Sequence, residues 1–113
     1  MPQLNISIGK AVTKEQLEKL QLAIGGIMPL IPGKNIDNTV ISVNSGLDMY
    51  KGGARWEGAF VDVRLYKSSP EEAKEEFYKK LCEVFAEVLS INASHVQANF
   101  IELPKWAAGG RYF

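Results

Sequence analysis

Hydrophobic and polar positions in the first half of the chain change their spacing twice, which predicts a strand, a helix and a second strand. Residues Gln3–Ile8 alternate between polar and apolar side chains, as a half-buried strand requires. After Thr13, a favourable N-cap, apolar residues recur at helical spacing. These residues are Leu17, Leu20, Ile24, Ile27, Met28 and Ile31. The β-branched segment Thr39–Val43 then predicts the second strand.

The second half of the chain repeats this order of elements. Ala59–Tyr66 alternates as a strand, and Ser69 is predicted to cap a helix with Pro70 at its first position. The apolar stripe of this helix consists of Ala73, Phe77, Leu81, Phe85, Val88 and Leu89. His95–Leu103 predicts the last strand, and a glycine-containing tail, Trp106–Phe113, follows. Trp106 is expected to anchor a subunit interface or to line a pocket entrance.

The two halves are predicted to be pseudo-repeats, at about residues 1–47 and 58–103, within a single domain that spans residues 1–113. A shift of 56 positions places Thr13 on Ser69, with few identities. The sequence therefore predicts an α/β fold (α+β, two layers) made of tandem βαβ units. We expect a four-stranded mixed sheet with two helices on one face.

A ferredoxin-like βαββαβ sandwich has the same order of elements and remains an alternative at this stage. The connection over residues 44–58 separates the second and third strands, and it is longer than the short hairpin usual at that point of a ferredoxin-like fold. This length favours tandem βαβ units. The uncovered sheet face carries some apolar residues, so we also expect the protein to oligomerise.

The composition of the chain narrows its function classes. Thirteen basic residues balance thirteen acidic ones, so no overall charge favours nucleic acid or an anionic membrane. No apolar run is long enough to span a bilayer, and the first ten residues do not resemble a signal peptide. Cys82 is the single cysteine, which excludes an internal disulfide and a cysteine-rich metal site. We expect a cytoplasmic protein without a metal.

Pro2 is the first candidate for chemistry. Met1 precedes a small residue and is expected to be removed, which would leave a secondary amine at the terminus. An apolar pocket or a nearby cation disfavours the protonated amine and lowers its pKa. A neutral amine at physiological pH suits proton transfer next to a carbonyl. If Met1 is retained, the nitrogen of Pro2 is an amide without basicity.

The chain resembles the tautomerase superfamily, and in length and layout it is closest to the macrophage migration inhibitory factor and 5-carboxymethyl-2-hydroxymuconate isomerase families. The resemblance rests on the opening MPQLNI, the βαβ–βαβ order, the PGK loop, KKLCEVFAEVLSI in the second helix and HVQANFIEL in the last strand. It implies a homotrimer with active sites between subunits. It also implies a cofactor-independent isomerase whose amino-terminal proline shuttles protons in small 2-oxo acids or their enols, such as phenylpyruvate.

The resemblance also assigns pocket residues by position. Lys34 matches a pocket lysine that would bind a substrate carboxylate or stabilise an enolate, although a solvated loop lysine fits the sequence equally well. Asn99 matches an asparagine that binds substrate from the adjacent subunit, or it is a polar residue on the wet face of a strand. Tyr66 falls at an apolar pocket wall, where packing in the core or at an interface is the alternative.

Three residues mark departures or further options. Gln97 replaces the tyrosine that the superfamily places on the last strand. Arg64 shares a strand face with Tyr66 and would be a second carboxylate clamp, or else a partner in a surface ion pair. Glu102 corresponds to the acid that hydrating or dehalogenating relatives use to activate water. A hydratase or dehalogenase, and a non-catalytic binding or signalling protein on the same scaffold, therefore remain alternatives to a tautomerase.

Overall fold

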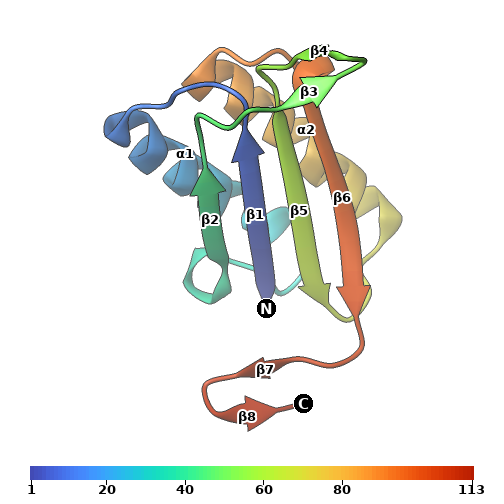
Figure 1. The fold of residues 1–113 in the computed structure, drawn as a ribbon. Coiled ribbons are helices and arrows are strands. Elements are labelled where there is room, and N and C mark those ends of the chain that lie inside the picture. Colours follow the sequence, from blue (N-terminus) through green and yellow to red (C-terminus); the bar gives the residue numbers. More distant parts are fainter.

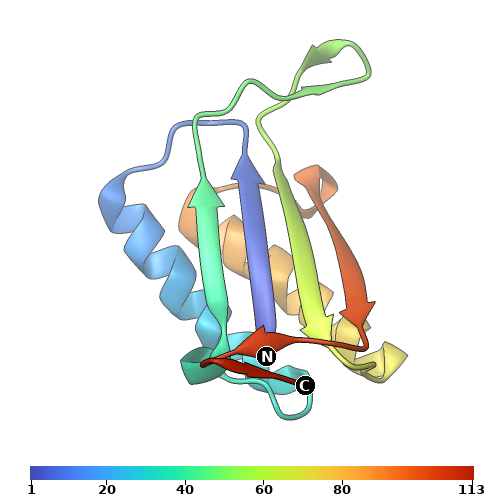
Figure 2. The same ribbon diagram turned by 60° about the horizontal axis from the view of Figure 1, so that its bottom comes forward.

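Four strands and two helices form the two layers of the fold in this computed structural model, which describes residues 1–113 (Figure 1). The sheet has the strand order β2-β1-β5-β6, and both helices cover one of its faces (Figure 2). The elements of these layers are β1 (Pro2–Ile8), α1 (Lys14–Ile27), β2 (Val40–Asn44), β5 (Ala59–Tyr66), α2 (Glu71–Leu89) and β6 (Val96–Leu103). The predicted α/β architecture is confirmed.

The sheet is mixed, and its pairings identify two tandem βαβ units. Strands β1 and β2 run parallel, as do β5 and β6, whereas β1 and β5 are antiparallel. Each helix joins two strands that are direct neighbours, whereas the split βαβ unit of a ferredoxin-like sandwich inserts a strand between them. The tandem arrangement is therefore correct. Because Pro2 pairs with Leu65 and Ile8 with Ala59, the two units begin at opposite ends of the sheet.

The hydrophobic core lies between the helices and the facing side of the sheet. Alternation along β1 and β5 turns every second side chain toward the helices, and these side chains are fully buried. On α2, Phe77 and Phe85 are the largest side chains that are fully buried in this core. Burying a side chain of this size stabilises the fold by about 1.5–3 kcal/mol. The fully buried residues of the two central strands are Leu4, Ile6, Ile8, Ala59, Val61, Val63 and Leu65.

The first helix begins as the sequence predicts. The Thr13 side chain accepts a hydrogen bond from the backbone N–H of Gln16, whose side chain in turn accepts one from the Thr13 N–H. A single 3-10 turn, η1 (Met28–Leu30), continues the chain after the helix. Gly25 is buried because the side chain of Ile36 occupies the place that a Cβ atom would take, 2.5 Å from Ile36 Cδ1.

The start of the second helix corrects the sequence-based prediction. Pro70, not Ser69, is the N-cap residue of α2, and no side chain caps this helix terminus. The backbone N–H of Ser69 instead donates a hydrogen bond to the Glu102 carboxylate, 2.6 Å away. This bond between the segment before α2 and the end of β6 is long-range, and nothing in the local sequence signals it.

Two small hairpins lie outside the main sheet. One consists of β3 (Tyr50–Lys51) and β4 (Ala54–Arg55). It lies within the connection over residues 44–58, where the sequence predicts no strand. The other, β7 (Ala107–Ala108) with β8 (Arg111–Tyr112), is formed by the tail. Figure 1 shows them at opposite ends of the sheet.

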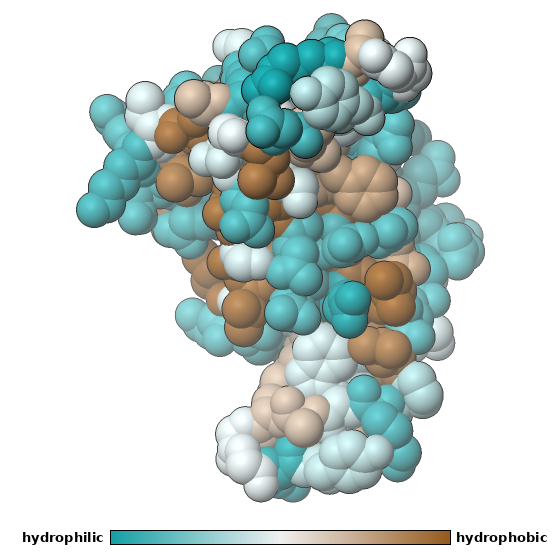
Figure 3. All heavy atoms as spheres, viewed as in Figure 1, coloured by the Kyte–Doolittle hydropathy of each residue, from teal (hydrophilic) through white to brown (hydrophobic).

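The sheet face away from the helices is mainly polar along its middle, with hydrophobic side chains around it (Figure 3). Its polar residues come from all four strands, and Val40 is 62% exposed. The residues of this face on the two central strands are Gln3, Asn5, Ser7, Phe60, Asp62, Arg64 and Tyr66. Neither helix combines the length and the apolar character needed to cross a lipid bilayer.

Candidate active site

The start of β1 lies beside a groove of about 310 Å³. Pro2 is buried at its edge, because the alternation of β1 turns this residue toward the helical side of the sheet. The groove continues over Asn38, which ends the 3-10 turn η2 (Ile36–Asn38), and over Val40 at the start of β2. Trp106 and the β7 strand close it from the tail. The groove therefore combines apolar walls with the amino terminus.

The peptide groups of Tyr66 join the amino terminus to Lys34. The backbone N–H of Tyr66 donates to the Met1 carbonyl at 3.3 Å, and the Lys34 ammonium donates to the Tyr66 carbonyl at 3.5 Å. The Tyr66 ring packs edge-on against Phe113, with 5.2 Å between ring centroids. Lys67 Nζ lies 5.1 Å from the centroid of the same ring. Two lysines are thus gathered at this end of the sheet.

The environment of the terminal amine favours its neutral form. Partial burial, together with a hydrogen bond and charge repulsion from Lys34, lowers the pKa of the Met1 α-amino group from 8.0 to about 6. A buried ammonium loses hydration, and the positive charge of Lys34 destabilises a second positive charge beside it. At neutral pH most amines in this position are therefore free bases.

Three predicted site residues are exposed on the open face of the sheet. Arg64 is exposed on the open sheet face, opposite Gln3 in the β1–β5 register. Gln97 and Asn99 are exposed on β6, five and three positions before Glu102, the residue level with the start of β1. At about 3.3 Å per residue, they lie about 16 and 10 Å farther along the sheet. The chain brings Pro2, Lys34 and Tyr66 together and places Arg64 on the open face opposite Gln3 of the groove, whereas Gln97 and Asn99 lie farther away.

Glu102 has a structural environment. One carboxylate oxygen accepts the N–H of Ser69 at 2.6 Å, and the other lies 3.1 Å from the ammonium of Lys74. The Ser69 N–H, followed by Lys74, lowers the pKa of Glu102. Both oxygens are therefore engaged, and Glu102 is not among the residues that line the groove at Pro2. This geometry gives no support to a water-activating role.

Sequence reasoning missed two residues of the groove. Trp106 was expected at a pocket entrance or an interface without a definite place, and Asn38 was not singled out. The spacing of Asn35 and Asn38 is a variant of the capping box, so this signal was present in the sequence.

No three His, Cys, Asp or Glu side chains gather in a cluster that could hold a metal ion.

No protein-family model matches the chain, and no curated protein matches it in sequence. Solved structures do match. Leishmania major MIF2 has a TM-score of 0.90 at 16% identity, covering 100% of this chain and 97% of that one. A macrophage migration inhibitory factor-like protein from Entamoeba histolytica has a TM-score of 0.86 at 20% identity, covering 99% and 98%.

A third match is the R7 fused 4-OT protein, solved as an asymmetric trimer, with a TM-score of 0.86 at 16% identity and coverage of 96% and 94%. At these identities the comparison concerns the fold, and the matched lengths show that nearly all of each chain takes part. These structural neighbours are tautomerase-superfamily proteins. The chain described here has the tautomerase fold.

Proposed function

We propose that the protein is a cofactor-independent tautomerase of small 2-oxo acids, and that the amine of Pro2 is its general base once Met1 has been removed. The observation that carries this proposal is the position of Pro2. It begins a central strand, it is buried, and it borders a groove whose lining residues include no carboxylic acid. A fixed amine in such a groove is suited to receive and return one proton.

The environment of the amino terminus supports the basicity that this role requires. Burial and Lys34 already lower the pKa of the Met1 amine to about 6. Removal of Met1 transfers the amine to Pro2, which is buried whereas Met1 is 36% exposed. We therefore expect the amine of Pro2 to be unprotonated at neutral pH.

The proposed reaction transfers one proton and breaks no carbon–carbon bond. In the ketonisation of phenylenolpyruvate, the enol oxygen loses its proton and the neighbouring carbon gains one. The amine of Pro2 would carry the proton between them. Lys34 would bind the substrate carboxylate, or the oxygen that becomes negative as the proton moves, because an ammonium stabilises a developing anion in a partly dry groove.

The substrate class follows from the charges near the groove. Lys34 and Lys67 both lie at this end of the sheet, and Lys34 is in contact with the Tyr66 peptide. Their charge favours an anionic ligand, and a groove of about 310 Å³ suits a small one. The tail contributes Trp106 as an apolar wall, which suits an aromatic or alkyl substituent on the acid.

We further propose that the protein is a homotrimer and that its site is completed across a subunit boundary. Gln97 and Asn99 are exposed and too far from Pro2 to act on the same substrate within one chain. A neighbouring copy would bring them to the groove, and Arg64 would then bind substrate or pair with that copy. Light scattering should give three times the chain mass of 12.5 kDa; a monomer would refute this part of the proposal.

Intact-mass spectrometry and one assay test the catalytic proposal. The purified protein should lack the mass of Met1 and should ketonise phenylenolpyruvate. Pro2→Ala keeps a small second residue, so Met1 is still expected to leave, but it replaces a fixed secondary amine with a flexible primary one. We expect kcat/KM to fall by about 10²–10⁴.

Pro104→Ala serves as the matched control, because Pro104, which directly follows β6, is exposed and does not line the groove. It should retain wild-type kcat/KM. Normal turnover by Pro2→Ala would reject the proposed base. Retention of Met1 in the native host would leave an amide at Pro2, and the protein would then be a ligand-binding protein on this scaffold.

A further inference from the structure

The side chain of Asn38 holds both peptide groups that flank Lys34. Its Nδ2 donates to the carbonyl of Gly33 at 3.2 Å, and its Oδ1 accepts from the N–H of Asn35 at 3.1 Å. The first of these groups belongs to the peptide bond before Lys34, and the second belongs to the bond after it. One carboxamide therefore spans the backbone of Lys34 on both sides.

The rest of the loop reinforces this arrangement. The N–H of Lys34 donates to the Ile31 carbonyl at 3.1 Å, and the Thr39 hydroxyl donates to the Asn35 carbonyl at 2.6 Å. The Asn35 side chain accepts from the Asn38 N–H at 3.2 Å, which completes a reciprocal pair. The loop that carries Lys34 is thus held by five hydrogen bonds in all.

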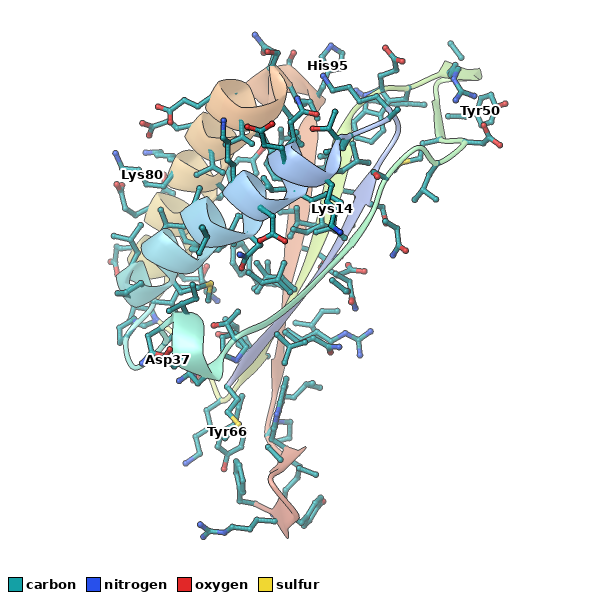
Figure 4. All side chains as sticks on the ribbon, turned by 90° about the vertical axis from the view of Figure 1, so that its left-hand side faces the viewer. Lys14, Asp37, Tyr50, Tyr66, Lys80 and His95 are labelled. Atoms are coloured by element: carbon teal, nitrogen blue, oxygen red, sulfur yellow. The ribbon has the colours of Figure 1, made fainter.

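A side chain also anchors this loop to the first helix. Ile36, the first residue of the turn, packs into the notch that Gly25 leaves in α1. The loop is consequently attached to the core at one point and tied by Asn38 at another. Figure 4 shows the turn, labelled at Asp37, at the same end of the sheet as Tyr66, whose carbonyl receives the Lys34 ammonium.

The corresponding turn of the second unit lacks this clamp. There, η3 (Ala93–His95) also follows an asparagine N-cap, Asn92, whose side chain accepts from the N–H of Ser94 at 2.9 Å. Its third residue, His95, accepts a hydrogen bond from the Trp56 indole and does not reach back to the peptide groups before Asn92. The clamp is therefore a specific feature of the turn that carries Lys34.

We propose that Asn38 is a positioning residue, which acts on the substrate through Lys34 by fixing the backbone from which that side chain extends. This inference rests on the proposed function, since it assigns Lys34 to the binding of an anionic substrate. The Lys34 side chain has four rotatable bonds, so its ammonium keeps a constant position relative to the groove only when the Cα atom is fixed. Misplacement of a binding group by about 1 Å can cost up to about 10²-fold in rate.

A double-mutant cycle separates this role from a merely structural one. Asn38→Ala should lower kcat/KM for phenylenolpyruvate roughly tenfold to a hundredfold, mainly through KM. In the Lys34→Ala background the same substitution should change kcat/KM by less than about twofold, because the group that it positions is already gone. Asn92→Ala, which removes one N-cap hydrogen bond at the opposite end of the sheet, is the control and should leave kcat/KM unchanged.

A second readout keeps the inference testable if the protein does not turn this enol over. Binding of phenylpyruvate is measured by NMR chemical-shift titration in the same four proteins of the cycle. If the wild-type protein binds phenylpyruvate but does not ketonise phenylenolpyruvate, the proposed function is rejected. The positioning role then still predicts that Asn38→Ala weakens binding only when Lys34 is present. If Asn38→Ala weakens turnover or binding equally in both backgrounds, Asn38 contacts the ligand itself and the positioning role is wrong. Absence of binding to wild type would overturn both proposals.

Discussion

The two ends of the sheet are pseudo-equivalent, because each is where one βαβ unit starts, yet only one of them has an open amino terminus. At the first end, β1 begins at Pro2 beside a groove and close to Lys34. At the second end, β5 begins at Ala59, which is fully buried. Figure 4 places Tyr66 at the first end and His95 at the second.

At the second end, the position before β5 is filled by a tightly packed peptide. Gly58 occupies the position before β5 that Met1 occupies before β1, and its carbonyl accepts the N–H of Gly9 at 2.9 Å. A Cβ atom at Gly58 would lie 2.3 Å from the Trp56 ring and 2.5 Å from the His95 carbonyl. The Trp56 indole N–H donates to His95 Nδ1 at 3.2 Å, which fixes both rings.

The comparison shows how a symmetric scaffold acquires one reactive end. At each end a central strand starts, β1 or β5, and a hairpin lies nearby. A 3-10 turn with an asparagine N-cap precedes the parallel neighbour of that strand, with η2 before β2 and η3 before β6. The residue before that N-cap is Lys34 at the first end and the buried Ile91 at the second. A free chain terminus, and a lysine in place of a buried isoleucine before the N-cap, distinguish the ends, while their backbone architecture is shared.

Among the substitutions that test this comparison of the two ends, the largest effect is expected from removal of Lys34 at the open end. Lys34→Ala should lower kcat/KM for phenylenolpyruvate by about tenfold to a hundredfold, since a charge-assisted contact to an anion contributes about 1.5–3 kcal/mol. The positive charge of Lys34 lowers the pKa of the terminal amine, so its loss should raise that pKa. Because the neutral amine is the active form, the rising limb of the pH–kcat/KM profile should move to higher pH.

The same pH profile supplies the control for this prediction. Lys80→Ala removes a lysine on α2 that lies away from the groove, at the site labelled in Figure 4. It should leave both the rate and the position of the limb unchanged. A limb that moves to lower pH in Lys34→Ala, or that does not move, would contradict the assignment of Lys34 as the neighbour of the amine.

The sequence predicted the layers and the order of the elements because periodicity is a local signal. Alternation in Gln3–Ile8 and Ala59–Tyr66 and the stripes of both helices depend on which side chains meet the core, and the burial pattern agrees with them. The direction of the two units followed from the length of the connection over residues 44–58. The predicted Ser69 cap was wrong, since α2 starts one residue later with Pro70 as N-cap, and the N–H of Ser69 bonds to Glu102, which is distant in sequence.

The site was less predictable, because its contacts join distant segments. Nothing near Lys34 in the sequence indicates that its ammonium meets the carbonyl of Tyr66, and nothing near Trp106 indicates that the tail closes the groove. The sequence also does not indicate that Gly25 leaves a notch in α1. Its function, to receive Ile36 from the following turn, depends on the packing of the loop.

A smaller effect is expected from substitution at the closed end, and it concerns stability. Gly58→Ala forces a methyl group against the Trp56 ring and the His95 carbonyl, and overpacking of this kind costs about 1–3 kcal/mol. Urea unfolding should therefore show a lower midpoint with an unchanged slope. The kcat/KM of the folded fraction should equal that of wild type, since the groove lies at the other end.

Gly26→Ala is the matched control for this substitution. No heavy atom lies within 4 Å of a Cβ atom at Gly26, which is in the last turn of α1. Alanine there should raise the unfolding free energy by about 0.5–1 kcal/mol, because it restricts the unfolded chain and favours the helix. If Gly58→Ala proves as stable as wild type, the second end is not closed by close packing as described.

The smallest effect on catalysis is expected at Glu102, which lies at the open end but faces α2. Glu102→Gln should change kcat/KM by less than about twofold, since the carboxylate is bound to Ser69 and Lys74 outside the groove. Its effect should be on stability. The folded pKa of Glu102 lies below its ordinary value of 4.5, so its contribution is fully present above pH 4.5 and is lost as pH falls through the lowered pKa. The difference in Tm between wild type and Glu102→Gln should accordingly be greatest near neutral pH and shrink on acidification. A large loss of activity at an unchanged Tm would instead place Glu102 in the chemistry and make both faces of this end of the sheet functional.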